Sequence, residues 1–371
     1  MYISTTLCRA VRSRRPKPNL TMKNYAAKPL PVEVVFHPSW WNRHAGIVFD
    51  EDFFYDPRRR VADEQRMEQT LHERFADCGL GIDHAEARPE IGAVHLAAGY
   101  LLSEMLGCRI EYGADTAPQV ICAHREELTI DEEAPFRSAA FKRLEALIDT
   151  LKARYGYVTG DINWGGVLNL AIDLKGESVL MDMMIDPEGT KAYFEAIGRV
   201  VERFFNYLRS QTGTTSISVN RIVRHFDQPI YLHSECSHTM ISEQDYESLL
   251  LPIDRRWSRL YGPYGIHYCG SDPHRHAAQF AQIENLAFLD LGWGGDVAAL
   301  RAALPETFFS LRLNPVEIGG YSSDELREII ASRVAASGDR YRTGICCINM
   351  DADVSDERVR EIYRIADELR R

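Results

Sequence analysis

Short apolar segments alternate with longer amphipathic segments through the second half of the chain. Five apolar segments begin at residues 229, 265, 286, 307 and 342, and each precedes a stretch with apolar residues at helical spacing. Such spacing is typical of helices with one buried face, and the short apolar segments are typical of buried strands. Further strands are predicted over residues 32–36 (VEVVF) and 156–163 (GYVTGDIN). Repeated strand–helix units predict a parallel sheet covered by helices.

The ends of two helices can be predicted from single residues. Residues 56–79 carry apolar positions at helical spacing among many charges, which predicts a surface helix ending near Gly79. Residues 186–211 predict a long helix with Asp186 as its N-cap and Pro187 in its first turn. The length of 371 residues fits a single (β/α)₈ TIM-type barrel better than two doubly wound domains. We therefore expect an α/β fold with one barrel over residues 31–371.

Residues 1–30 differ in charge from the rest of the chain. They contain seven basic residues and no acidic residue. We expect a basic, disordered N-terminal extension, with an Arg-rich transit peptide or an arm for a polyanion as alternatives.

The overall composition limits the classes of partner. The chain has 43 Lys+Arg against 54 Asp+Glu and a net charge of -11, which disfavours nucleic acid as a partner. No apolar run approaches the ~20 residues needed to cross a bilayer, so no membrane partner is expected. The eight cysteines are spread thinly and form no small-domain disulfide pattern. A reducing cytoplasm is the expected location.

A candidate metal site begins with His267 and Cys269, at the end of a predicted strand. Residues two apart on a strand point to the same side, so both side chains can bind one ion. Cys346 or Cys347 offers a third ligand, because all strand ends of a barrel meet at one rim. One histidine and two thiolates suit a zinc site with an open position. A thiol entering that position would lose its proton, which favours alkyl transfer to sulfur, although activation of water is an alternative.

Other polar residues also follow predicted strands. His233 and Glu235 either line the pocket or belong to a helix entry, and Cys236 nearby is a competing metal ligand. Asp161 and Asn163 lie at the end of the strand predicted over residues 156–163 and are candidates for the pocket wall. Together, these polar strand ends are expected to line one opening of the barrel.

Taken in order, these motifs resemble the uroporphyrinogen decarboxylase superfamily, which includes zinc-dependent methyltransferases that work with corrinoid proteins. Residues 265–270 (GIHYCG) match the His-x-Cys-Gly signature of the methyltransferase branch. Residues 160–188 resemble the family's strand, Gly-rich turn and Asp-Pro segment, and residues 238–257 resemble its helix entry. Residues 351–362 resemble the segment after the last zinc cysteine of that branch. The resemblance implies a (β/α)₈ barrel.

The methyltransferase branch implies specific roles. His267, Cys269 and Cys347 would bind Zn²⁺, with Cys346 as the alternative to Cys347. The methyl group would pass between a corrinoid (methylcobalamin) on a partner corrinoid protein and a small thiol or another nucleophile. The expected catalytic residues are Glu235 and Asp161. The expected substrate-binding residues are Arg43, Asn163, His233 and Arg312.

The decarboxylase branch is the alternative. Its Arg-Gln-Ala-Gly-Arg segment resembles NRHAGI here, in which Arg43 is present but Ile47 replaces the second arginine. The family's catalytic aspartate falls near Ala98. Decarboxylation of uroporphyrinogen is therefore disfavoured, and the alternative becomes a metal-independent lyase for a smaller carboxylate, with Arg43 and Arg312 as anchors. A non-enzymatic corrinoid- or tetrapyrrole-binding protein is a third possibility.

Overall fold

The computed structural model describes residues 29–92, 99–213 and 220–371. Of the expected extension, only Pro29 and Leu30 are among the described residues. Ala98 also lies outside the described residues. Leu30 is buried, and its N–H donates to the carbonyl of Arg340 over 2.9 Å. Arg370 donates to the carbonyls of Pro29 and Leu30, over 2.8 Å in each case. These two residues are therefore fastened to the C-terminal part of the fold.

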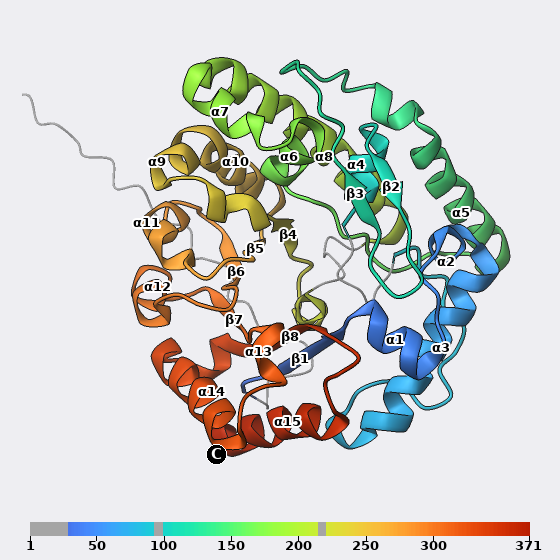
Figure 1. Cartoon of the computed structure of the whole chain (residues 1–371), viewed down its shortest axis with the longest axis vertical. Helices are drawn as coiled ribbons and strands as arrows, with labels where there is room; N and C mark the ends of the chain where they lie inside the picture. Colours follow the sequence, from blue (N-terminus) through green and yellow to red (C-terminus); the bar gives the residue numbers. More distant parts are fainter. Residues whose placement is uncertain (1–28, 93–98, 214–219) are drawn as a thin grey trace, which may run out of the picture.

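A curled parallel sheet forms the centre of the molecule, with helices around its outside (Figure 1). Among the described residues it has six strands, in the order β1-β8-β7-β6-β5-β4. Their bounds are β1 Val32–Phe36, β4 Tyr231–Ser234, β5 Tyr264–His267, β6 Leu286–Asp290, β7 Phe308–Arg312 and β8 Thr343–Met350. The five strand–helix units predicted in the second half of the chain are confirmed as β4 to β8, each followed by helical structure.

The segment predicted as a strand over residues 156–163 is reduced to a parallel bridge between Glu90 and Thr159. The N–H of Ile91 donates to the carbonyl of Thr159 over 3.0 Å. Gly160 then turns the chain with a φ of 94°, a conformation that ends regular pairing. The described architecture is thus a six-stranded curled sheet, consistent with a TIM-type barrel, and two bridged segments lie between β1 and β4 in the chain.

Helices cover the outer face of the sheet. The helices are α1 Pro38–Ala45, α2 Glu51–Tyr55, α3 Pro57–Phe75, α4 Leu101–Met105, α5 Ala139–Tyr155, α6 Val167–Lys175, α7 Ser178–Ile185, α8 Pro187–Thr212, α9 Glu243–Asp245, α10 Leu251–Tyr261, α11 Ala277–Phe280, α12 Val297–Ala303, α13 Pro315–Ile318, α14 Ser323–Ser337 and α15 Asp356–Arg370. A small antiparallel pair, β2 Arg109–Glu111 with β3 Gln119–Ile121, was not expected. None of the described helices has the length and apolarity required to span a membrane.

The two predicted helix ends are confirmed. The side chain of Asp186 accepts from the N–H of Gly189 over 2.9 Å at the start of α8, with Pro187 as the first helical residue. Helix α3 and the short turn after it end at Gly79, whose φ of 76° suits a glycine cap.

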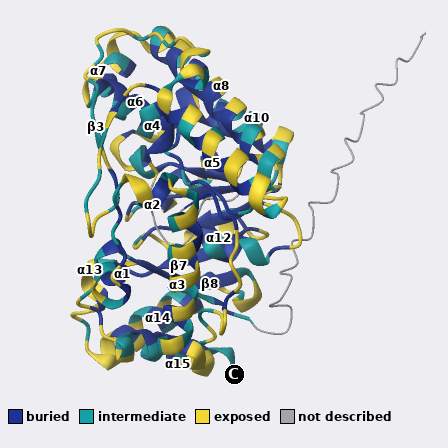
Figure 2. Cartoon of the chain, turned by 90° about the vertical axis from the view of Figure 1, so that its right-hand side faces the viewer, coloured by how far each residue is buried: buried dark blue, intermediate teal, exposed yellow. Residues whose placement is uncertain are grey.

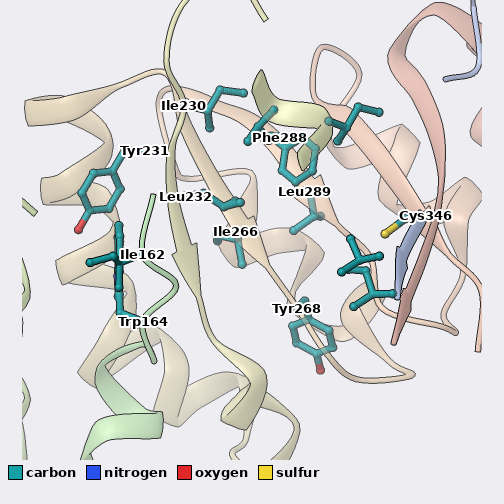
Figure 3. Close-up of a cluster of buried hydrophobic side chains, with 14 of the residues drawn as sticks. Ile162, Trp164, Ile230, Tyr231, Leu232, Ile266, Tyr268, Phe288, Leu289 and Cys346 are labelled. Atoms are coloured by element: carbon teal, nitrogen blue, oxygen red, sulfur yellow. The ribbon is translucent and has the colours of Figure 1, made fainter. Parts of the chain in front are cut away.

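The sheet encloses an apolar core. The rings of Phe288 on β6 and Phe308 on β7 stack 5.9 Å apart, and Figure 3 shows Phe288 among the buried side chains of neighbouring strands. Figure 2 shows buried residues concentrated in the interior and exposed residues on the outward faces of the helices. The core is therefore continuous from the strands to the surrounding helices.

The connection between α8 and β4 contributes described residues to the inner side of the curled sheet. Its described part includes the short helical turn η3 (Arg221–His225), which lies inside the ring between β4 and β1 (olive in Figure 1). Phe226 after this turn packs edge-on against Phe308, with ring centroids 5.2 Å apart. The N–H of Arg221 donates to Glu33 on β1. Asn220, immediately before the turn, is thereby held inside the barrel.

Candidate metal centre

Cys236, His267 and Cys269 come together at the carboxyl ends of β4 and β5. Ser234 pairs with His267 in the parallel register, and the N–H of Glu235 donates to the carbonyl of His267 over 3.0 Å. This pairing places the ligand atoms of the three side chains within 4.8 Å of one another. The Nε2 atom of His267 lies 3.1 Å from the sulfur of Cys269. The structure joins the sulfurs of Cys236 and Cys269 in a disulfide, with their Cα atoms 4.5 Å apart.

The other ring nitrogen of His267 is held by two residues. Its Nδ1 atom lies 2.6 Å from Oδ1 of Asn220 and 2.9 Å from Oδ2 of Asp290. The amide Nδ2 of Asn220 donates to the same carboxylate over 2.9 Å. Two acceptors at Nδ1 favour the tautomer with the proton on Nδ1, which leaves the Nε2 lone pair directed at the thiols. This arrangement is usual for metal-binding histidines.

Arg312 provides the positive charge of the centre. Its guanidinium pairs with Asp290, and its Nη2 atom lies 2.9 Å and 3.0 Å from the two ring nitrogens of His267. Its Nη1 atom lies 3.5 Å from the sulfur of Cys269. Burial and the charge of Arg312 lower the pKa of His267, so the imidazole is neutral and able to bind a metal. Burial opposes ionisation of Asp290, but the charge of Arg312 and the hydrogen bonds from His267 and Arg312 outweigh it and lower the pKa of that carboxyl.

The adjacent cysteines of β8 occupy opposite faces of the strand. Cys346 pairs in register with Arg312 and Glu33, whereas Cys347 pairs with Val34. Both are completely buried, and burial raises the pKa of each thiol. Neither belongs to the group of metal-binding atoms found among the described residues. Their assignment as ligands stays a prediction.

Glu235 and His233 lie in a separate buried network. The carboxylate of Glu235 accepts from the N–H of Leu168 over 3.0 Å and so caps α6. Nδ1 of His233 lies 3.0 Å from Asp254, whose carboxylate also accepts from the hydroxyl of Tyr264 over 2.6 Å. Burial raises the pKa of Glu235 to about 7. Because His233 precedes Ser234, which pairs with His267, its side chain points to the opposite face of the sheet from that of His267.

Three further predicted residues lie in other settings. Asp161 pairs with Arg224 and lines a cavity of about 300 Å³ that also contacts Arg88. Asn163 lines a cavity of about 30 Å³ with mainly apolar walls. Arg43 is half exposed and pairs with Asp353 over 3.0 Å. Of the predicted site residues, the structure therefore brings His267, Cys269 and Arg312 together.

Neither Asn220 nor Asp290 was among the predicted site residues. Asp290 ends β6 and pairs with His267 across the sheet, so strand ends were a usable signal for it. Asn220 belongs to a connection between elements, where hydrophobic periodicity carries no information.

Comparisons with known proteins support the fold. The sequence matches no family model. It matches none of the curated proteins. A methyltransferase from Methanosarcina mazei has a similar structure, with a TM-score of 0.59, 12% identity, and coverage of 92% of this chain and 94% of that one. A B12-independent methionine synthase from Shewanella sp. W3-18-1, solved in complex with selenomethionine, gives a TM-score of 0.46 at 9% identity over 94% of this chain and 96% of that one. At this identity, the similarity to the Methanosarcina enzyme shows that the chain shares the fold of a methyltransferase.

Proposed function

We propose that this chain is a zinc-dependent methyltransferase whose metal is bound by Cys236, His267 and Cys269. The methyl group would pass between a corrinoid carried on a partner protein and a small thiol or another nucleophile. The observation that carries the proposal is the convergence of the sulfurs of Cys236 and Cys269 on a histidine whose Nδ1 atom contacts Asp290 and Asn220. This donor set fits zinc in chemistry and in number for a catalytic site.

The residues around His267 prepare it as a ligand. The Nδ1 atom of His267 contacts both Asn220 and Asp290, so rotation of the ring would lose both contacts. Arg312 balances the charge of Asp290 and approaches Cys269, where a positive group stabilises sulfur in its thiolate form. In the reduced chain these contacts would favour the states of His267 and Cys269 that bind a metal.

The proposed ligand set with Cys236 differs from the set with Cys347 in its access to solvent. Cys236 and Cys269 are partly exposed, whereas Cys346 and Cys347 are completely buried. A ligand set reached from solvent leaves room for a small substrate beside the metal. Zinc bound there would present an incoming thiol as a thiolate, which is the nucleophilic form. Cys236 therefore takes the position that the sequence analysis gave to Cys347.

The choice of methyl transfer rests on the fold and on the sequence motifs together. The fold is shared with a methyltransferase, and residues 265–270 carry the His-x-Cys-Gly motif. The lyase alternative has weaker support, because both arginines suggested as carboxylate anchors already pair with carboxylates of the chain. Arg43 pairs with Asp353, and Arg312 pairs with Asp290.

Metal content and methyl transfer test the proposal together. We expect about one zinc ion per chain by elemental analysis of the reduced protein, and loss of that zinc in Cys269→Ser. The zinc-loaded protein should consume methylcobalamin in the presence of a small thiol, and Cys269→Ser should not. Retention of full zinc by Cys269→Ser would contradict the proposed ligands, and activity that survives complete chelation would favour the lyase.

A further inference from the structure

The candidate metal centre contains two cysteines that can also bond to each other. Cys236 and Cys269 are 33 residues apart in sequence, and their Cα atoms lie 4.5 Å apart. Disulfides span Cα separations of about 4.4–6.8 Å, and this pair lies within that range. The pairing of Ser234 with His267 fixes this separation, because each cysteine follows its strand by two residues. The sheet itself therefore presents the two thiols to each other.

Access favours oxidation at this pair over the two cysteines of β8. Cys236 and Cys269 are partly exposed, whereas Cys346 and Cys347 have no exposed surface. A small dissolved oxidant can reach the first pair without opening the fold. Exposure is one of the conditions that make a cysteine pair responsive to redox changes.

Charge balance also allows the two states to exchange. A zinc ion with two thiolates has no net charge, and a disulfide has none. The buried ion pair of Arg312 with Asp290 is therefore balanced in both states. An uncompensated buried charge would be costly, and neither state requires one.

We propose that Cys236 and Cys269 form a redox modification site in which the disulfide and the metal-bound state exclude each other. This inference rests on the proposed function for its metal-bound state, while the disulfide itself does not depend on it. The oxidant is a small-molecule disulfide such as oxidised glutathione. One cysteine thiolate attacks a sulfur of the oxidant, forms a mixed disulfide and releases one glutathione thiolate. The second cysteine thiolate attacks the mixed disulfide, forms the Cys236–Cys269 bond and releases the second glutathione thiolate.

The electrons balance in this sequence. Two electrons pass from the two cysteine sulfurs to the oxidant, which becomes two thiols. Of the three ligands, only His267 then remains a good zinc donor, because a neutral disulfide sulfur replaces each thiolate. One imidazole does not retain zinc against water. Oxidation would thus switch off the proposed methyl transfer, and a reducing thiol would restore it.

The experiment compares the full chain in reduced zinc-loaded and reduced metal-free forms. Each form is incubated with oxidised glutathione, the Cys236–Cys269 link is quantified by peptide mass mapping, and released zinc is followed with a chromogenic chelator. We expect the link to form in the metal-free protein. With free zinc buffered at 100 times its dissociation constant, the rate should fall about 100-fold, because only the metal-free fraction reacts. Dithiothreitol should restore zinc binding.

Two variants serve as controls. Cys236→Ala should give no link and no second glutathione release. Cys122→Ser removes another partly exposed cysteine, which lies after β3, and should react like the unaltered chain.

The outcomes separate this inference from the proposed function. Glutathione adducts on Cys236 and Cys269 without a link, or equal rates with and without bound zinc, would overturn the inference while leaving zinc binding intact. A chain that forms the link but binds no zinc would instead refute the proposed function and the exclusion between the two states.

Discussion

The Oδ2 atom of Asp290 lies 2.9 Å from Nδ1 of His267 and also pairs with Arg312. One carboxylate therefore orients the histidine and neutralises the guanidinium that packs against its ring. Asn220 reinforces the arrangement, since it contacts both His267 and Asp290.

Asn220→Ala should weaken zinc binding by about 10- to 100-fold, the usual effect of removing a group that orients a metal-binding histidine. The substitution removes an uncharged group, so it avoids the large destabilisation expected from Asp290→Asn, which would leave Arg312 buried and unpaired. Zinc affinity is measured by competition with a chromogenic chelator. Asn285→Ala, which removes an amide bonded to Ser258 far from the cysteines, is the control. Equal affinities for the two variants would argue against this role of Asn220.

Serine substitutions discriminate between the two possible third ligands. Cys236→Ser should reduce bound zinc well below one ion per chain, because it removes an atom of the compact donor group. Cys347→Ser should leave zinc content unchanged, since Cys347 lies on the opposite face of β8 from Cys346 and Arg312. Elemental analysis beside circular dichroism separates zinc loss from unfolding. The reverse result would restore Cys347 as the ligand.

A substitution in the barrel interior tests whether the turn η3 is fastened there. A Cβ added at Gly344 would lie 3.0 Å from Cδ1 of Ile222 and 3.1 Å from the ring of Phe308. Gly344→Ala should therefore destabilise the protein by about 1–3 kcal/mol, as overpacking does. Adding Ile222→Val removes the nearest contact and should restore part of that stability. Urea unfolding of the four proteins gives the coupling energy, and strict additivity would count against this contact.

The contribution of His276 to stability should fall as the pH decreases below about 6.5, because this residue is buried in neutral form. Burial, assisted by Arg275, lowers the pKa of His276 to about 4. Between pH 6.5 and 4 the unfolded chain binds a proton that the folded chain does not. This group therefore removes up to about 1.4 kcal/mol per pH unit as the pH falls through that window.

Replacing His276 should remove its contribution to the pH dependence of the free energy of unfolding. His276 packs against the ring of Tyr246, with centroids 5.1 Å apart, so His276→Phe keeps an aromatic neighbour there. The free energy of unfolding is measured at several pH values between 4 and 7. His274→Phe alters an exposed histidine two residues away and should keep the original slope. Identical slopes in all three proteins would show that His276 does not cause the dependence.

The sequence predicted elements well where single residues decide an end. Asp186 and Pro187 marked the start of α8 because their chemistry acts on the first turn alone. The strand predicted over residues 156–163 was reduced to a bridge, since Gly160 takes a left-handed conformation that apolar alternation cannot reveal. Features set by local chemistry could therefore be predicted from the sequence, whereas pairing between distant segments was harder to predict.

The same distinction applies to the candidate site. His267 and Cys269 share a strand end, so their proximity followed from spacing alone. The identity of the third thiol depended on which loops lie next to each other in the fold. The β4–β5 pairing brings Cys236 next to His267 and Cys269. Asn220 could not be predicted, because its position depends on a connection that folds into the barrel.

Because of that connection, the residues of the candidate metal centre come from two separate parts of the fold. The proposed ligands follow β4 and β5 at the carboxyl edge of the sheet, whereas Asn220 arrives through the chain that leads into the amino edge of β4. Loops at the carboxyl edge of such barrels vary freely with substrate. A histidine supported from the opposite edge keeps its orientation while those loops change, so new substrate preferences can evolve around an unaltered metal ligand.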